Sequence, residues 1–235
     1  MWTAASLRVA RRYTARPGIP AIALAAAAPW LAGWLWLAAA ALAALTGAVL
    51  LFFRDPPRRP LPAPPGTVYA VTDGTVRAVR RDVTVPWLPG GPYTQVSVFL
   101  SLLDVHTARS PVAGRLESWT KLDGQCRTAM RQAAETENRR GQLTITPDSG
   151  GAVIGVLLAA GLIARRITQW ARPGALTPGE RLGIIHFGSR SVLYLPQDRY
   201  RVMVAAGDLL AAGRTPVARI LYRTPTYQTG KAPPP

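Results

Sequence analysis

The longest uncharged stretch of the chain runs from residue 17 to residue 53, and it limits what the N-terminal part can fold into. As one straight helix this run would be about 55 Å long, whereas the hydrocarbon core of a bilayer is about 30 Å thick. Two passes of roughly 18 residues each fit the bilayer better. Pro29 and Gly33 lie near the middle of the run, where a turn is needed, and tryptophans suited to a membrane interface stand beside them: Trp30, Trp34 and Trp36.

Arginines flank the run on both sides. Those before it are Arg8, Arg11, Arg12 and Arg16, and those after it are Arg54, Arg58 and Arg59. Positive residues near a span favour the cytoplasmic side, so both ends of the run are expected there. The sequence therefore predicts a transmembrane helical hairpin within residues 1–55, anchored in a bacterial inner membrane, with the rest of the chain on the cytoplasmic face. Because the alanines of the first half are weakly hydrophobic, the alternative is that this half only dips into the membrane.

Composition narrows the partners of the remaining chain. The net charge is +16, and nearly all of the positive charge is arginine, since the only lysines are Lys121 and Lys231. Such a basic chain favours an anionic partner, and the hairpin makes anionic lipid headgroups the natural one. Nucleic acid is not expected, because no basic stretch is interleaved with aromatic residues in a recognisable module. The single cysteine, Cys126, excludes an internal disulfide and a zinc site built from several cysteines.

A proline-rich linker, residues 56–66, leads into a domain at 67–235 that is mainly β with a few helices. Short alternating runs with turn residues between them indicate the strands: TVYAVT, GTVRAV, QVSVFLSLL, AGRLESW, QLTITP, AVIGVLLAAG, RLGIIHFG, SVLYLP and YRVMVAAG. Helix-forming residues favour a helix near 126–140. The glycine turns of VMVAAGDLLAAGRTPVARI (202–220) are typical of a lipoyl-type barrel-sandwich, with an ordinary β-hairpin as the alternative.

Three short stretches hold candidates for chemistry. Asp73 lies between two strand-like runs, His106 follows an apolar strand, and Ser189 follows a glycine in HFGSR. Each has an ordinary structural explanation, because Asp-Gly and Gly-Ser pairs are common in turns and many histidines only form structural hydrogen bonds. Together, however, an Asp, a His and a Ser are the residue types of an orienting group, a base and a nucleophile. The G-x-S-x-G elbow of α/β-hydrolases is absent from the sequence.

The chain resembles the phosphatidylserine decarboxylase family, especially its short bacterial and archaeal form. The resemblance runs from FFRDP (52–56) to the C-terminus, and the order and spacing of its motifs make it specific. The other stretches that carry it are TDG (72–74), SLLDVHTARSPVAG (101–114), ETENRR (135–140), AAGLIARRI (159–167), PGERLGIIHFGSR (178–190) and YLP (194–196). Departures from the family pattern, such as Ala108 before Arg109, leave the Asp, His and Ser in place.

The resemblance implies that the protein cuts its own chain between Gly188 and Ser189. Ser189 would attack the carbonyl of Gly188, and β-elimination from the resulting ester would release a chain of residues 1–188. The remaining dehydroalanine would hydrolyse to a pyruvoyl group at the start of a chain of residues 189–235, and the two chains would stay together as a heterodimer. His106 would be the base, held by Asp73.

The resemblance further implies a carbon–carbon lyase, a carboxy-lyase that converts phosphatidylserine to phosphatidylethanolamine and carbon dioxide. The pyruvoyl carbonyl at residue 189 would form a Schiff base with the substrate amine, His106 would return a proton, and no metal is expected. Arg109 and Arg190 are weak candidates for the substrate phosphate, and an ordinary structural role is favoured for both. A related serine lipid of archaeal type is an alternative substrate, a non-catalytic membrane-tethered β domain is an alternative function, and a higher oligomer remains open.

Overall fold

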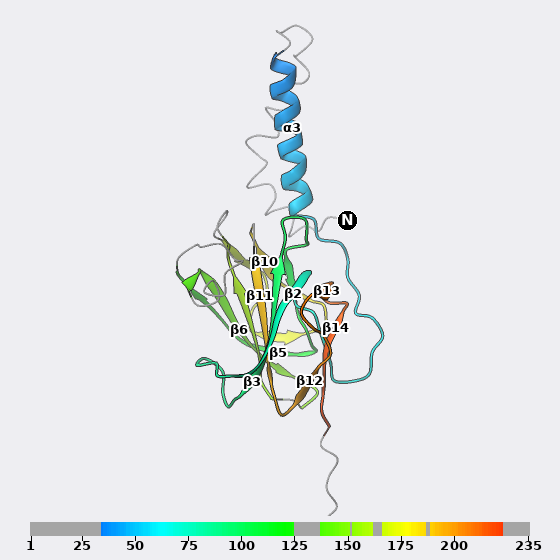
Figure 1. The fold of residues 1–235 in the computed structure, drawn as a ribbon, viewed down its shortest axis with the longest axis vertical. Coiled ribbons are helices and arrows are strands. Elements are labelled where there is room, and N and C mark those ends of the chain that lie inside the picture. The colour runs from blue at the N-terminus through cyan, green and yellow to red at the C-terminus, as the bar shows by residue number, and fades with distance from the viewer. Residues whose placement is uncertain (1–33, 125–136, 151, 162–165, 187–188, 223–235) are drawn as a thin grey trace, which may run out of the picture.

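The structure is a computed structural model that describes residues 34–124, 137–150, 152–161, 166–186 and 189–222, except for the side chain of Ser189. One helix, α3 (Trp34–Phe52), projects from a β domain (Figure 1). Its 19 residues carry no charge, and most of its side chains are exposed. In the described part of the chain, α3 is the one helix long and apolar enough to cross a membrane. The first half of the predicted hairpin lies outside the described residues.

The domain is mainly β, as predicted. Its strands are β1 (Thr67–Tyr69), β2 (Gly74–Val83), β3 (Tyr93–Leu100), β4 (Thr107–Arg109), β5 (Gly114–Leu122), β6 (Arg140–Pro147), β7 (Ile154–Ala159), β8 (Ile167–Gln169), β9 (Gly174–Leu176), β10 (Arg181–Ile185), β11 (Ser189–Pro196), β12 (Tyr200–Val202), β13 (Leu209–Leu210) and β14 (Pro216–Ile220). The helix expected near 126–140 falls mostly outside the described residues, and its last residue, Arg140, begins β6 instead.

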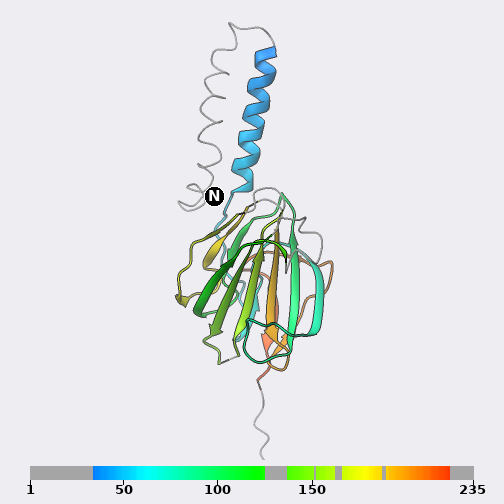
Figure 2. The same ribbon diagram turned by 90° about the vertical axis from the view of Figure 1, so that its left-hand side faces the viewer.

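Antiparallel pairing joins these strands into one large sheet and two small ones. The eight-stranded sheet has the order β13-β2-β3-β11-β7-β6-β5-β9, and the three-stranded sheets have the orders β1-β14-β12 and β4-β10-β8. The large sheet faces the viewer in Figure 2. The main hydrophobic core contains alternate residues of the large sheet and residues of both small sheets. Alternation places one face of each long strand in that core, which is why period-2 runs in the sequence marked these strands correctly.

The two small sheets are related by a repeated pattern of hydrogen bonds. The N–H of Tyr69 in β1 donates to the carbonyl of Pro111 (2.8 Å), and the N–H of Arg109 in β4 donates to the carbonyl of Val71 (2.8 Å). Tyr69 in one half thus takes the place of Arg109 in the other, and Val71 takes the place of Pro111. By the same correspondence, β1 and β2 match β4 and β5. The domain thus consists of two similar halves that exchange backbone hydrogen bonds where they meet.

Two glycines continue this repeat. The N–H of Gly213 donates to the carbonyl of Ala70 (2.7 Å), and that of Gly179 donates to the carbonyl of Ser110 (2.9 Å). Both glycines have positive φ, and a Cβ added to Gly213 would lie 2.9 Å from the Cα of Gly179. Glycine is required because the two turns meet backbone to backbone. The glycine turns predicted between 202 and 220 are therefore confirmed, while the lipoyl-type comparison stays a prediction.

The linker between α3 and the domain is fastened by ion pairs. Asp55 is fully buried and accepts from Arg109 at 2.6 Å and from Arg181 at 2.6 Å, and these arginines belong to the paired strands β4 and β10. Further along, the hydroxyl of Tyr69 donates to the carbonyl of Leu61 (2.7 Å). The proline-rich segment therefore lies along the domain, and it ties the base of α3 to the strands that carry the candidate histidine.

Replacing Asp55 by Asn tests this fastening. We expect the free energy of unfolding to fall by about 3 kcal/mol or more, because two arginines lose a buried counter-ion. The matched control is Glu117→Gln, which breaks the exposed Arg115–Glu117 pair (3.6 Å) and is expected to cost less than about 1 kcal/mol. Chemical unfolding of the detergent-solubilised chain, followed by tryptophan fluorescence, measures both. Equal losses in the two variants would contradict the assignment.

Candidate active site

The large sheet brings two of the sequence motifs together at one end of its neighbouring strands β2, β3 and β11. Ser189, the first residue of β11, is paired with Leu100, the last residue of β3. Next to β3, Thr75 at the start of β2 is paired with Phe99, so the Asp73–Gly74 turn lies at the same end of the strands. Gly74 is necessary there because an added Cβ would lie 2.3 Å from the carbonyl oxygen of Phe99. The fold therefore gathers the Asp and Ser stretches from opposite ends of the domain sequence.

Backbone pairing brings His106 to the segment that ends in Ser189. His106 immediately precedes β4, and its carbonyl accepts the N–H of Ile185, the last residue of β10, at 3.2 Å. Ser189 follows Ile185 by only four residues. The imidazole of His106 is completely buried, and the ring of Phe52 from the end of α3 packs on it with a centroid separation of 4.1 Å. The candidate base is therefore enclosed between the domain and the end of α3.

The hydrogen bonds of His106 determine its tautomer. Nδ1 lies 2.9 Å from the backbone carbonyl oxygen of Asp104. A carbonyl can only accept, so Nδ1 carries the proton and Nε2 carries the lone pair. Nε2 is buried and has no hydrogen-bond partner among the described residues. A neutral imidazole with a buried, uncommitted lone pair has the properties of a general base.

Burial also sets the charge state of His106. Removal from water lowers its pKa from about 6.5 to about 4, although the hydrogen bond to the Asp104 carbonyl and the charge of Asp104 act in the opposite direction. The ring is therefore neutral at pH 7. It can accept a proton from a nearby hydroxyl without first losing one.

Asp73 is held by two groups that sequence analysis did not single out for this role. One carboxylate oxygen accepts from Arg58 of the linker at 2.7 Å, and the other accepts the backbone N–H of Ala212 at 2.7 Å. Burial raises the pKa of Asp73, while the Ala212 N–H and the Arg58 charge lower it. The charges of Asp104 and Arg54 act on both Asp73 and His106, so the two side chains share an electrostatic environment. No hydrogen bond joins Asp73 to His106 in the described part of the chain.

The second histidine, His186, has a different environment. It is buried, its Nε2 lies 3.0 Å from the hydroxyl of Thr168, and the Phe53 ring packs against it with a centroid separation of 5.3 Å. Its backbone N–H donates to the carbonyl of Arg166 at 2.9 Å. These contacts hold the end of β10 in place just before the Gly188–Ser189 bond.

The two candidate substrate arginines lie in separate places. The Arg109 guanidinium is buried and bonds Asp55, the Gly179 carbonyl (2.9 Å) and the Pro56 carbonyl (3.0 Å). Arg190 is buried too, and its Nη1 lies 3.4 Å from the hydroxyl of Ser97. These contacts agree with the structural role that the sequence favoured for both residues, and a role in binding phosphate stays a prediction.

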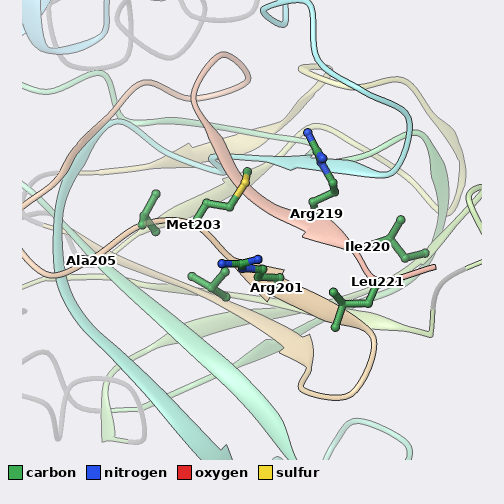
Figure 3. A pocket seen from close by; sticks show the side chains of 8 residues that line it. Arg201, Met203, Ala205, Arg219, Ile220 and Leu221 are labelled. Carbon is green, nitrogen blue, oxygen red and sulfur yellow. The ribbon is translucent and has the colours of Figure 1, made fainter. Parts of the chain in front are cut away.

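A cavity of about 710 Å³ lies elsewhere, over β12 and β14 (Figure 3). Arg201, Met203 and Arg219 are among its lining residues, and Asp73 and His106 are not. Among the described residues, no group of three or more His, Cys, Asp or Glu side chains is placed to hold a metal ion. The candidate catalytic residues therefore lie at the ends of β2, β3 and β11 and not in this cavity.

Comparison with known sequences decides the family. Residues 45–218 match the family described as phosphatidylserine decarboxylase. The chain belongs to the phosphatidylserine decarboxylase family. The matched range includes the C-terminal part of α3, the strands β1 to β13 and the first residues of β14. The family predicted from the sequence motifs is thereby confirmed.

Individual relatives agree over nearly their whole length. A protein of Symbiobacterium thermophilum is 40% identical over 212 residues, which are 89% of this chain and 97% of the relative. One of Nitrosomonas europaea is 43% identical over 209 residues (87% and 94%), and one of Solibacter usitatus is 39% identical over 208 residues (86% and 94%). All three are named phosphatidylserine decarboxylase proenzyme.

The lowered pKa of His106 predicts a specific loss of stability in acid. Because the folded pKa is about 4 and the unfolded pKa about 6.5, the unfolded chain binds the proton first as the pH falls. The contribution of neutral His106 is complete above about pH 6.5, and about 3 kcal/mol of it is lost by about pH 4.

Unfolding free energies measured between pH 7.5 and 4 test this, with Ser189→Ala as the background so that the chain stays intact. The variant that also carries His106→Asn is expected to show a shallower acid slope, and the difference between the two curves isolates this one side chain. Parallel curves would contradict the assigned pKa.

Proposed function

We propose that this chain is the proenzyme of a pyruvoyl-dependent decarboxylase that converts phosphatidylserine to phosphatidylethanolamine and carbon dioxide. The family and the proenzyme names of three relatives support the reaction class. The single structural observation that carries the proposal is the buried Nε2 lone pair of His106, placed by its backbone next to the segment that ends in Ser189. A non-catalytic β domain would have no need of an uncompensated polar atom in that position.

The first stage is self-cleavage, and His106 acts as its base. Its Nε2 takes the proton of the Ser189 hydroxyl, whose oxygen then bonds the carbonyl carbon of Gly188. The chain now runs through an ester instead of an amide, and elimination breaks that ester to leave Gly188 with a free carboxylate. The serine becomes a dehydroalanine and then, with water and loss of ammonia, the pyruvoyl group. A serine hydroxyl needs such a base because it is a weak nucleophile at neutral pH.

The residues present fit a pyruvoyl group at position 189. Position 189 begins β11 and follows Ile185, whose N–H bonds the carbonyl of His106, by four residues. The group supplies an electrophilic carbonyl that binds the substrate amine and accepts the electron pair left by carbon dioxide. His106 can then deliver a proton to the carbon that lost the carboxylate, and Phe52 keeps bulk water from the ring.

Asp73 is proposed to assist the first stage as a positioning residue. The Asp104 carbonyl already fixes the tautomer of His106, so a second hydrogen bond to Nδ1 is not needed. In this proposal Asp73 instead contributes negative charge at the same end of the strands, which would stabilise the imidazolium formed when Ser189 gives up its proton. Arg58 and the Ala212 N–H hold its carboxylate in place.

The sheet explains how the two products of cleavage would remain a heterodimer. The short chain begins with β11, which is paired on one side with β3 and on the other with β7. It also contributes β13 against β2 and β14 against β1. The short chain is therefore threaded through the core of the domain, and its separation would expose most of that core to water.

For the membrane part, we propose that α3 is the second half of a hairpin whose ends both face the cytoplasm, at the bacterial inner membrane. The length and apolar composition of α3 and the arginines on both flanks of residues 17–53 support this topology. The repeated halves of the domain and their glycine turns support the comparison with lipoyl-type barrel-sandwich folds.

Cleavage between Gly188 and Ser189 is the first prediction of the proposed function. The purified protein is expected to run as two bands, residues 1–188 and 189–235, with the shorter chain resistant to Edman degradation because it begins with a pyruvoyl group. Ser189→Ala should give one uncut band without decarboxylase activity, assayed by release of labelled carbon dioxide from phosphatidylserine. An active yet entirely uncut wild-type protein would overturn the mechanism.

The role of Asp73 separates maturation from turnover. Asp73→Asn is expected to slow self-cleavage severalfold, because the imidazolium loses a stabilising charge, while the fraction that matures keeps most of its activity per cleaved chain. The control is Asp208→Asn, since Asp208 also shapes a glycine turn by accepting the N–H of Ala205 (2.8 Å) but lies outside the site. Cleavage is followed on gels from synthesis onward. Wild-type cleavage speed in Asp73→Asn would reduce Asp73 to a turn residue.

A further inference from the structure

The loop between β3 and β4 exposes two leucines at the end of the domain that adjoins α3. Leu102 is 50% exposed and Leu103 is 72% exposed, whereas Leu100, just before them, is buried in the core. Exposed adjacent leucines on a polar domain often mark a surface that contacts a protein or a membrane. The question is therefore which partner covers them.

The loop holds these leucines in a fixed turn. The Asp104 carboxylate accepts both the N–H and the hydroxyl of Ser101, each at 2.7 Å, and the Asp104 N–H donates to the Ser101 carbonyl at 3.1 Å. The same turn provides the carbonyl that fixes the His106 tautomer. The leucines are thus part of an ordered element directly connected to the active site.

The end of α3 lies against this loop. Arg54, two residues after α3 ends, donates a hydrogen bond to the carbonyl of Leu103, and Phe52 packs on His106. The connection from β3 to β4 accordingly lies beside the lower end of α3 in Figure 1. If α3 spans a bilayer, the membrane surface lies at the level of Leu102 and Leu103, because the apolar segment ends there.

We propose that Leu102 and Leu103 form a second membrane contact, inserted into the interfacial layer of the bilayer beside α3. The contact is continuous with the apolar surface of α3, and Arg54 stands at the level where anionic headgroups lie. The loop thereby holds the opening of the site against the lipid surface. This last step rests on the proposed function, while the contact itself rests on the position of the loop.

The contact gives a route for a substrate that cannot leave the bilayer. His106 follows Leu103 by three positions in the sequence. A lipid whose acyl chains stay beside α3 can present its headgroup to the site without transfer of those chains through water, which would be costly for each methylene exposed. The inference is therefore that the loop serves access to lipid in a bilayer and is not needed for the chemical steps.

Depth measurements on the full chain test the contact directly. Single cysteines replace Leu102 or Leu103 in a Cys126→Ser background, carry an environment-sensitive fluorophore, and are reconstituted in phosphatidylcholine–phosphatidylglycerol vesicles. Lipids brominated on their acyl chains should quench both probes. The control is Met203→Cys, because Met203 is also exposed but lies just after β12 and lines the cavity of Figure 3. Quenching at 102 and 103 no stronger than at 203 would overturn the proposal.

Substrate presentation gives the second test. The double variant Leu102→Ser with Leu103→Ser should cleave itself normally and act normally on a short-chain, water-soluble phosphatidylserine. Its rate on long-chain phosphatidylserine in vesicles should fall about tenfold, the equivalent of about 1.4 kcal/mol. The control variant Leu209→Ser removes another exposed leucine and should leave both rates unchanged.

The two assays separate failure of this inference from failure of the proposed function. Equal rates of the double variant and the wild type on vesicles would overturn the role of the loop in access. Absence of turnover by the wild type on both substrates would instead overturn the decarboxylase assignment, and the quenching result would still decide whether the loop contacts the membrane.

Discussion

The buried carboxylate of Asp55 is the interaction on which the arrangement of α3 and the candidate active site depends. Its two arginine partners belong to β4 and β10, the strands whose pairing also places the His106 carbonyl on Ile185. A fully buried carboxylate is tolerable only when its charge is compensated. Departure of the linker would in turn leave the buried Arg109 without its counter-ion and would break the ion pair of the partly exposed Arg181. The ion cluster therefore fixes both the base of α3, which covers His106, and the strand pair that carries it.

The active site arises from differences between two similar halves. The carbonyl of Gly66 accepts the N–H of Ile220 at 2.9 Å, as the carbonyl of His106 accepts that of Ile185, so a glycine stands in one half where the histidine stands in the other. Asp73 likewise precedes Gly74 as Ala113 precedes Gly114, and both glycines closely approach a backbone carbonyl. Both halves thus have the same backbone frame at these strand ends, and the candidate catalytic side chains are present in only one half.

Features that depend on residues close together in the sequence could be predicted, whereas contacts between residues far apart in the sequence could not. The strands, the glycine turns and the apolar α3 depend on local patterns, and these predictions were confirmed. The family motifs identified Asp73, His106 and Ser189, but not what holds them. Asp55 pairs with residues 54 and 126 positions away, and no local pattern reveals such pairs. The Asp104 carbonyl that fixes the His106 tautomer had no sequence signal, because every residue has a carbonyl and only the fold determines its direction.

The low pKa of His106 suits the two proposed stages unequally. At pH 7 a group with a pKa of about 4 is almost entirely neutral, so it is ready to accept the Ser189 proton but rarely carries one to give back. A proton donor in the second stage therefore requires a raised pKa. The substrate can provide this change, because its carboxylate would bring a negative charge next to the imidazole and favour the charged ring. Loss of carbon dioxide then removes that charge, which lowers the pKa again and favours transfer of the proton to the new carbanionic carbon. In the proposed mechanism, the same burial that would make His106 a base for cleavage would thus let it act as an acid only when substrate is bound.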